Sequence, residues 1–339
     1  MAAKRTCRGR PAARGPGRPG RAPVRRLTRD RVTMFFDPRA EPAAEIAPGE
    51  HIVVETADSL CGLVKREAPA GFAIGDVLER LGGACPVTGP VYVAGAEPGG
   101  VIEVHIERVS ASPTAGRGWT GVFAGFGALT HEAYSLQEPL EPVSTLVDYD
   151  TGTARLGLGG GRVAELPVRP FLGTVGVAPR RERRMSFSQS PEYLGDVDLP
   201  GVTGGAVLVL PVHVPGALLA LGDAHAAQGD GEITGAAIEI EAEAELWCVP
   251  RDSEDAGFTG LPQLNTASFL GSVAGLQGND LTDCARAAYR DLALRLTRHH
   301  GLPLREAYML LGQAGRLRVG NMIDPFYSVL ASIDRRFLA

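Results

Sequence analysis

The segment from Leu221 to Glu232, LGDAHAAQGDGE, gathers four titratable side chains and a glutamine directly after an apolar stretch. If the chain is extended up to His225, Asp223 and His225 project from the same side of one strand, because side chains two residues apart share a face. Carboxylate and imidazole groups both bind divalent metal ions. This spacing predicts a metal or ligand site at the end of a buried strand.

The second half of this segment repeats the pattern, with Asp230 and Glu232 two residues apart and Gln228 before them. Gly229 and Gly231 let the backbone turn and approach a small ligand closely. An ordinary acidic hairpin turn is the alternative interpretation. We favour a functional site, because an unpaired charge beside a buried strand would cost several kcal/mol.

The side chains that the sequence offers limit other hydrolytic machinery. The only lysines are Lys4 and Lys65, and the surroundings of Lys65, LVKREAP, resemble neither a Ser-Ser-Lys amidase motif nor a Glu-Lys-Cys nitrilase-type motif. The sequence has no GxSxG nucleophile elbow. Cys85 and Cys248 stay open as nucleophiles, since a histidine partner need not be adjacent in sequence. Buried structural cysteine is the favoured interpretation of both.

Short β segments must position these groups. Residues 51–56 (HIVVET) and 90–109 read as strands, and in the latter the alternation of apolar and polar residues after Val101 has the period of two of a half-buried strand. The sequence GAEPGG within 90–109 predicts a hairpin turn. Residues 206–225 form a nearly continuous apolar pair of strands interrupted by Pro215 and Gly216. These patterns predict a sheet protein over the first two thirds of the chain.

A further strand is expected over residues 238–246, where apolar residues alternate with four glutamates. The glutamates are Glu239, Glu241, Glu243 and Glu245. Acidic residues at strand spacing are typical of a solvated face, so we interpret this row as exposed and not as a metal-binding cluster.

The sequence becomes helical after about Pro250. Asp280 or Asn279 can cap a helix that runs to about His299, with Gly301 placed to end it. A second helix is expected near Pro303, followed by a short strand and a turn in LRVGNMIDPF. We therefore predict a β-sandwich body over residues 34–250 that carries the active site, and a smaller α/β part over residues 251–339.

Charge is distributed unevenly along the chain. Residues 1–33 carry eleven Lys or Arg against one acid, or +10, so the net charge of −5 leaves −15 for the remainder. The basic segment has little apolar surface and is expected to be a disordered tail, with a nucleic-acid arm or a true start at Met34 as alternatives. The acidic body argues against nucleic acid as a partner.

Five widely spaced cysteines without a CxxC pair favour a reducing compartment, and no apolar run is long enough to span a membrane. The basic opening lacks the apolar core of a signal peptide. A cytoplasmic protein without membrane partners is expected.

Residues 210–239, LPVHVPGALLALGDAHAAQGDGEITGAAIE, resemble the signature of the acetamidase/formamidase family. Further stretches agree in order and spacing. They are VETADSLCG (54–62), CPVTGPVYVAGAEPGG (85–100), RPFLGTVGVAPR (169–180) and AYMLLGQAGRLRVGNMIDP (307–325). The resemblance implies a jelly-roll-like sandwich, a homo-oligomer (dimer or higher), a divalent metal such as Zn or Ca, and hydrolysis of a short aliphatic amide to carboxylate and ammonia.

The matching positions, carried over residue by residue, predict the site. They are Asp58, Thr88, Gly89, Asp223, His225, Gln228, Asp230 and Glu232. We assign Asp58, Asp223 and His225 to metal, and Glu232 with Asp230 to proton transfer. Backbone N–H groups of the glycine-rich turn are expected to stabilise the oxyanion. Thr88, Gly89, Gln228 and Asp196 are assigned to substrate.

This sequence also departs from the family pattern. Asp196, within LGDVD (194–198), stands where the family has Asn, Cys85 stands where His or Asn is usual, and Arg316 stands where an acidic residue is common. An added carboxylate at Asp196 would change metal preference or substrate orientation. Two alternatives to the metal-assisted amidase therefore stay open: a metal-independent cysteine amidase, and a catalytically silent small-molecule-binding protein on the same scaffold.

Overall fold

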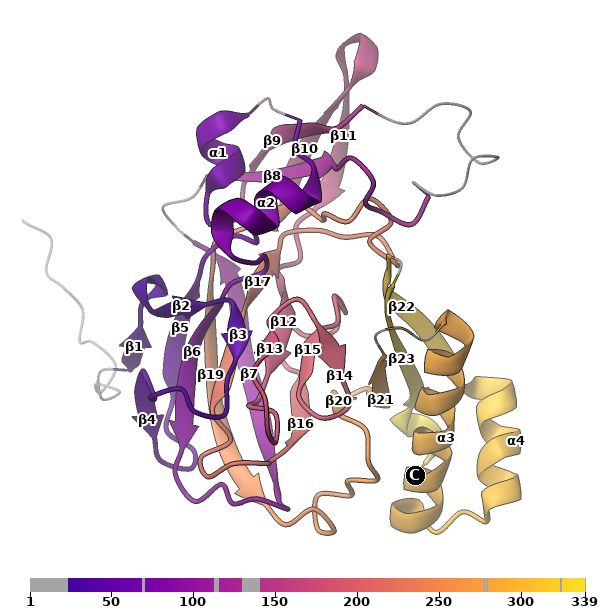
Figure 1. Cartoon of the computed structure of the whole chain (residues 1–339). Coiled ribbons are helices and arrows are strands. Elements are labelled where there is room, and N and C mark those ends of the chain that lie inside the picture. Colours follow the sequence, from indigo (N-terminus) through magenta and orange to yellow (C-terminus); the bar gives the residue numbers. More distant parts are fainter. Residues whose placement is uncertain are drawn as a thin grey trace, which may run out of the picture.

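The computed structural model describes residues 24–68, 71–112, 116–129, 141–276, 278, 280–323 and 325–338. Two large β-sheets form its body (Figure 1). The first contains, in spatial order, β1 (Arg25–Leu27), β5 (Ile52–Thr56), β19 (Ala242–Arg251), β7 (Val101–Ala111), β16 (Val207–Pro211), β20 (Gln263–Asn265), β21 (Phe269–Gly275), β23 (Phe326–Asp334) and β22 (Arg316–Ile323).

The second sheet carries the strands around the predicted site. Its path is β11 (Arg162–Pro167), β10 (Thr153–Leu158), β9 (Val143–Tyr149), β8 (Arg117–Val122), β18 (Glu239–Ile240), β17 (Leu219–His225), β12 (Phe171–Gly176), β15 (Leu194–Asp196) and β14 (Gln189–Ser190). Alongside β17 lies β6 (Val87–Val93), which also pairs with β2 (Val32–Thr33) and β4 (Ala44–Ile46). A separate ribbon joins β3 (Phe35–Phe36) to β13 (Arg184–Met185).

One hydrophobic core fills the space between the two sheets. Val104 and Leu208 contribute from the first sheet, and Leu172 and Leu221 from the second, all of them fully or almost fully buried. Burying both inner faces in this way is the arrangement of a β-sandwich. The prediction of a mainly β fold is confirmed.

The predicted hairpin at GAEPGG is wrong. β6 and β7 lie in different sheets, so residues 94–100 cross from one layer to the other and do not join paired strands. The same holds for β16 and β17, which pair with β7 and β12 respectively. The physical reason is that Gly95 and Gly99, with positive φ, indicate a turn but not which sheet the next strand joins: β6 pairs with β17, whereas β7 pairs with β16 and β19.

The predicted solvated row of glutamates is also wrong. Glu241, Glu243 and Glu245 are half-buried, with side chains 19%, 18% and 16% exposed. Arg26 Nη1 lies 2.9 Å from Glu243 Oε1, and Lys65 Nζ lies 3.2 Å from Glu241 Oε1. The cations that pair with this row come from distant parts of the chain, which a strand pattern by itself does not reveal.

The same pairing corrects the prediction for the basic tail. Residues 24–33, expected to be disordered, carry β1 and β2, and Arg26 in β1 binds both Glu55 and Glu243. β1 runs parallel to β5, with Arg26 opposite Val53. Residues 1–23 lie outside the described residues. The basic residues of 24–33 thus neutralise acidic strands of this protein.

The C-terminal part contains the two long helices that the sequence predicted. Helix α3 (Leu281–His300) is capped by Asp280, whose side chain accepts a hydrogen bond from the Asp283 N–H, and it ends at Gly301 in the left-handed conformation. It packs with α4 (Leu304–Ala314) against β21 and β23. The boundary predicted at residue 250 falls inside β19, and the first sheet continues into β20–β23 without a break.

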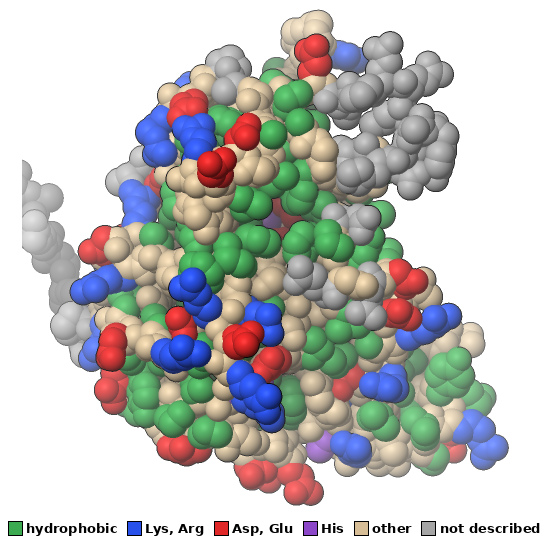
Figure 2. Space-filling model, in the orientation of Figure 1, with side chains coloured by type: hydrophobic (Ala, Val, Ile, Leu, Met, Phe, Trp, Pro, Cys, Tyr) green, Lys and Arg blue, Asp and Glu red, His purple; other side chains and the backbone are tan. Residues whose placement is uncertain are grey.

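Two short helices, α1 (Leu63–Glu67) and α2 (Ile74–Leu81), cover the region of β8 and β9 at the top of Figure 1. They enclose a small core, separate from the main one, around Leu63, Val77 and Trp119. In Figure 2 hydrophobic side chains border a recess below this region, with acidic and histidine side chains visible at its base. Within the described part of the chain, no helix is long and apolar enough to cross a membrane.

Candidate active site

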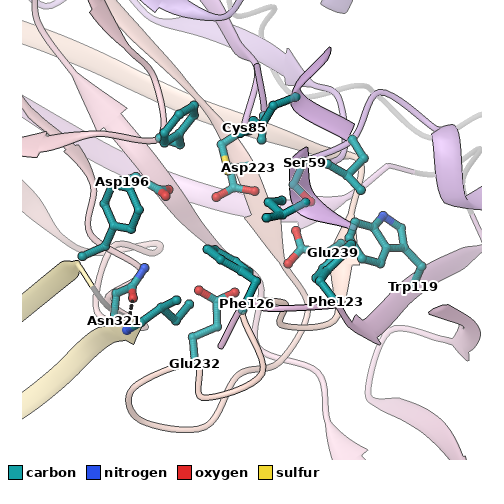
Figure 3. Close-up of a pocket in the computed structure, with 18 of the residues that line it drawn as sticks. Ser59, Cys85, Trp119, Phe123, Phe126, Asp196, Asp223, Glu232, Glu239 and Asn321 are labelled. Atoms are coloured by element: carbon teal, nitrogen blue, oxygen red, sulfur yellow. Dashed lines mark hydrogen bonds between the residues drawn. The ribbon is translucent and has the colours of Figure 1, made fainter. Parts of the chain in front are cut away.

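A cavity of about 280 Å³ lies between the small helical cover and the sandwich. Its walls are apolar, whereas its base is polar. The base consists of Cys85, Asp196, Asp223, Glu232, Glu239 and Asn321. In Figure 3 the carboxylates of Asp196, Asp223, Glu232 and Glu239 point into one space, with Asp196 contributed by β15 and the other three by residues 223–239. The predicted segment 221–232 thus supplies two of the four.

His225 lies directly behind this base, at the end of β17, and is 1% exposed. Its Nε2 atom lies 3.4 Å from Glu239 Oε2, 3.5 Å from Asp223 Oδ2 and 4.0 Å from Glu232 Oε1. The ring of Phe171 packs against it edge to face, with centroids 5.0 Å apart. One imidazole nitrogen therefore faces three carboxylates inside the protein.

Gln228 fixes the orientation of this imidazole. Gln228 Oε1 lies 2.8 Å from His225 Nδ1, and its Nε2 donates to the carbonyl oxygens of Asp198 (2.8 Å) and Gly320 (3.1 Å). Because both amide hydrogens go to carbonyls, Oε1 is the acceptor and Nδ1 carries a proton. The other nitrogen, Nε2, is left to serve the carboxylates. The assignment of Gln228 to substrate thus gives way to a positioning contact.

Asp196 and Asp223 share one hydroxyl. Thr174 Oγ1 donates to Asp196 Oδ1 in a short hydrogen bond and lies 3.2 Å from Asp223 Oδ2. Thr174 lies on β12, directly between β15, which carries Asp196, and β17, which carries Asp223. The carboxylate that departs from the family pattern at Asp196 therefore lies inside the site.

The backbone of the site is strained. Cys85, Asp198, Asp223 and Glu232 have φ of 52°, 48°, 52° and 45°, in the left-handed region that residues other than glycine avoid. Each such residue costs about 1–3 kcal/mol and persists only where its surroundings determine it. Glycine assists at Gly173, where a Cβ atom would lie 2.6 Å from Asp198 Oδ1 and 2.7 Å from Asp223 Oδ2. Clustered strain of this kind is typical of functional sites.

Burial raises the pKa of four carboxyl groups in and around the cavity base. It raises the pKa of Asp198 to about 7, and it raises the pKa of Asp196 and of Glu232 well above the usual range, with neighbouring carboxylates adding to the effect. Burial also raises the pKa of Glu239. Asp198 can therefore hold or release a proton near neutral pH, and the other three carboxyl groups bind a proton more readily than exposed ones.

The pKa shifts of Asp223 and His225 both favour the charged form of the group. Burial raises the pKa of the Asp223 carboxyl, but His225 and the hydrogen bonds to Asp223 outweigh it, and its pKa is lowered. Burial lowers the pKa of the His225 imidazolium, but the attraction of Glu239 and Asp223 outweighs it, and its pKa is raised well above its usual range. Groups with such divided pKa values are found where proton transfer is catalysed.

The donor atoms of the site fit a divalent metal ion. Asp223, His225 and Glu239 each offer a ligand atom within 4.8 Å of the others, and all three are buried. Asp198 with His225 and Glu232, and Cys85 with Asp196 and Asp223, form two overlapping groups of the same kind. Asp223 Oδ1 is buried without a hydrogen-bond partner. Buried oxygens without a partner are costly unless something binds them, and a cation would.

Asp58, Thr88, Gly89 and Asp230 lie apart from this base. Asp58 is fully buried, but its Oδ1 accepts hydrogen bonds from the N–H groups of Leu60 and Gly62. Its other oxygen lies 3.6 Å from Lys65 Nζ, so its position is that of a turn residue with a cation as neighbour.

Asp230 is 50% exposed at its side chain and pairs with Arg318 on the surface. Thr88 and Gly89 belong to β6, where the Thr88 hydroxyl donates to the carbonyl of Glu55 (2.7 Å). A Cβ atom at Gly89 would lie 2.9 Å from the carbonyl oxygen of Leu219. Thr88 and Gly89 therefore pack β6 against β17. Neither they nor Asp230 lines the cavity.

Three residues of the site escaped the sequence analysis. Glu239 was grouped with an exposed row, and neither Asp198 nor Asn321 was singled out. Asn321 Nδ2 donates to Asp198 Oδ2 (2.9 Å). A signal for Glu239 existed, since it belongs to the stretch 210–239 that resembles the family signature. It is also the residue at which β18 pairs with His225 in β17.

Comparisons with known proteins identify the family of this chain. A family model described as the acetamidase/formamidase family matches residues 29–194 and 188–329. An acetamidase of Mycolicibacterium smegmatis is 28% identical over 249 residues, 58% of this chain and 60% of that protein. The chain spans about 60% of the length of the curated relatives it matches.

Two solved structures share the fold over most of their length. The crystal structure of acetamidase from Yersinia enterocolitica has a TM-score of 0.83 and 30% identity, with 94% of each chain covered. The acetamidase from Bacillus halodurans has a TM-score of 0.79 and 28% identity, with 92% of this chain and 98% of that chain covered. The chain described here belongs to the acetamidase/formamidase family.

Proposed function

We propose that this protein hydrolyses a primary amide to a carboxylate and ammonia. The observation that carries the proposal is the base of the cavity. There one oriented imidazole faces buried carboxylates, some with a raised pKa and one with a lowered pKa. An amide has an unreactive carbonyl and a poor leaving group, so its hydrolysis needs both activation of water and delivery of a proton to nitrogen. Family membership and relatives named as acetamidases support the same reaction.

We propose that Asp223, His225 and Glu239 hold a divalent metal ion, with Glu239 in place of the initially assigned Asp58. The ion, when bound, would lower the pKa of water and polarise the amide carbonyl. Gln228 supports the arrangement by holding the Nδ1 proton of His225, which keeps Nε2 directed at the carboxylates. Zinc suits the imidazole ligand, whereas calcium would suit a set made of oxygens alone.

Glu232 is the proposed proton carrier. It lies at the cavity base beside His225, and burial with nearby Asp198 raises its pKa well above the usual range. A carboxyl group whose pKa is raised binds a proton more readily than an ordinary carboxylate, so it could take a proton from water and return it to the departing nitrogen. Asp196 lies across the cavity base, and its added carboxylate would orient the amide nitrogen through a hydrogen bond.

Cys85 is disfavoured as a nucleophile. Burial raises the pKa of its thiol well above the usual range, and the carboxylates of Asp196 and Asp223 raise it further. A nucleophilic cysteine requires a thiolate, which forms near cations and not beside carboxylates. The attacking group we propose is therefore water.

Ammonia release from purified protein tests the proposal. A panel from formamide to larger primary amides is measured before and after metal is removed with a chelator, and again after Zn²⁺ or Ca²⁺ is restored. We expect activity that chelation abolishes and one of the two ions restores. Activity that survives both chelation and Glu232→Gln would refute the metal-assisted scheme, and no ammonia from any amide would favour a silent binding protein.

We also propose that the chain forms a homo-oligomer. Helix α4 exposes Leu304, Tyr308 and Met309, whose residues are 54%, 74% and 62% exposed. Apolar residues that cluster on a helix face are typical of an interface between chains. Sedimentation of the wild type against Tyr308→Glu tests this, with a shift to monomer expected.

A further inference from the structure

We infer that the preferred substrate carries a bulky apolar acyl group, best an aromatic one, and not the one or two carbons of formamide or acetamide. This inference rests on the proposed amide hydrolysis, and it concerns the walls of the cavity where the mechanism concerns its base. The part of the substrate that is cleaved would lie at the carboxylates, and its acyl group would lie among the walls.

Aromatic rings make up much of the described wall. They are Trp119, Phe123, Phe126, Phe187 and Phe326. Trp119 and Phe123 meet edge to face, with centroids 6.1 Å apart and planes at 88°, and Phe187 meets Phe326 in the same way at 5.9 Å and 79°. Edge-to-face rings leave further faces and edges free for a guest ring, and aromatic pairs prefer this geometry. In Figure 3 the rings of Phe123 and Phe126 lie beside the carboxylates of Glu239 and Glu232.

The cavity is too large for a small acyl group. Its volume of about 280 Å³ compares with roughly 150 Å³ for an engineered apolar cavity that binds benzene. Acetamide would leave most of the apolar wall in contact with water, whereas a phenyl or long alkyl group would cover it. Each methylene group buried against such a wall is worth roughly four- to tenfold in binding.

Charge further restricts the acyl group. None of the described residues that line the cavity is Lys or Arg, whereas four carboxylates lie at its base. An acyl group with its own carboxylate would lie among the apolar walls, where it would find no Lys or Arg to pair with. The inferred substrate class is a neutral arylalkyl or long-chain primary amide.

A substrate series tests this inference. Ammonia release is measured for acetamide, butyramide, hexanamide, phenylacetamide and 3-phenylpropanamide, with succinamate as the charged comparison. We expect kcat/KM to rise with apolar size, with phenylacetamide at least a hundredfold above acetamide and succinamate below acetamide. Acetamide as the best substrate, or equal rates across the series, would overturn the inference and leave the proposed amide hydrolysis intact.

A matched pair of variants on α2 tests the wall itself. Leu78 lines the cavity and Leu81, on the same helix, does not. We expect Leu78→Phe to lower kcat/KM for phenylacetamide at least tenfold more than kcat/KM for acetamide, and Leu81→Phe to leave the ratio of the two within twofold of the wild type. Equal losses on both substrates in Leu78→Phe would overturn the assignment.

Calorimetric binding separates this inference from the proposed function. Phenylacetamide and acetamide are titrated into the same protein at the same pH. Tight binding of phenylacetamide without turnover would refute amide hydrolysis and support the apolar pocket. Binding of phenylacetamide no tighter than that of acetamide would overturn the inference whether or not either amide is cleaved.

Discussion

Glu239 and Glu241 are two residues apart, yet their surroundings differ in kind. Glu239 is 2% exposed, and its Oε2 faces His225 Nε2 at 3.4 Å. Glu241 is half-buried and pairs with Arg29 and Lys65. Burial raises the pKa of Glu239, whereas for Glu241 the nearby Lys65 and Arg29 outweigh burial and lower it.

The contrast shows what separates a structural carboxylate from a functional one in this protein. Glu241, Glu243 and Glu245 form an outer row that pairs with cations from β1, β7 and α1, so its charges are neutralised within the fold. The inner group consists of His225 and the carboxylates Asp198, Asp223, Glu232 and Glu239 around it. One imidazole cannot neutralise several carboxylates, so this group lacks positive charge. A buried group with uncompensated charge is destabilising by itself, and it persists where a ligand completes it.

The largest expected effect is a loss of activity that a substitution in the inner group causes and a substitution in the outer row does not. Glu232→Gln keeps the volume of the side chain but removes its ability to carry a proton, so kcat for the best amide should fall by about 10²–10⁴. Glu241→Gln is the matched control and should stay within twofold of wild type. Steady-state ammonia release checks both, and equal losses would contradict the distinction.

The next effect concerns stability against pH in metal-free protein. The pKa of Asp198 is about 7 in the folded state and 3.8 in the unfolded state, so the folded state binds the extra proton between these values. Stability is then fully present below pH 4 and is lost as pH rises toward 7, by on the order of 4 kcal/mol. The raised pKa of His225 acts in the same direction, and the lowered pKa of Asp223 acts oppositely in acid.

Thermal unfolding of chelated protein from pH 5 to pH 8 checks this sign. The melting temperature should fall with rising pH, and Asp198→Asn should flatten the curve. Adding Zn²⁺ or Ca²⁺ should restore stability at pH 8, because a bound cation favours the ionised carboxylates. A melting temperature that rises with pH in the chelated protein would contradict the assignment.

The sequence predicted the strands well where local pattern determines them. Ile52–Thr56, Leu219–His225 and the capped helix Leu281–His300 all follow from alternation, burial or caps. It failed where two distant segments decide the outcome. Whether a glutamate is paired depends on Arg26 or Lys65, which lie more than 170 residues away.

The same limit explains the site. Asp223, His225 and Glu232 were found because they are close in sequence, and Asp196 because it departs from a family pattern. Asp198 and Asn321 join them only through the folded backbone. Asp230 shares the spacing of Glu232 but points to Arg318 on the surface, because the turn at Gly231 directs the two side chains apart.

A smaller effect tests whether Gln228 holds His225 in the orientation that metal binding needs. Gln228→Leu removes the acceptor for His225 Nδ1 and leaves two carbonyl oxygens without their donor. Loss of such an outer contact typically weakens metal binding by about 10–100-fold. Competition with a chromophoric chelator measures this. Gln228→Glu keeps the acceptor and should recover part of the loss, which a merely destabilised fold would not.

The smallest effect is expected in the outer row. Glu243→Gln removes the charge that Arg26 contacts at 2.9 Å, but Arg26 keeps Glu55 at 2.7 Å. Arg26 is 43% exposed at its side chain, so solvent screens the pair and the loss of unfolding free energy should be about 0.5 kcal/mol. Urea unfolding measures it, with the double variant Arg26→Met and Glu243→Gln to isolate the pair. A loss of several kcal/mol, or any loss of amidase activity, would mean that the two rows of carboxylates are not separate in function.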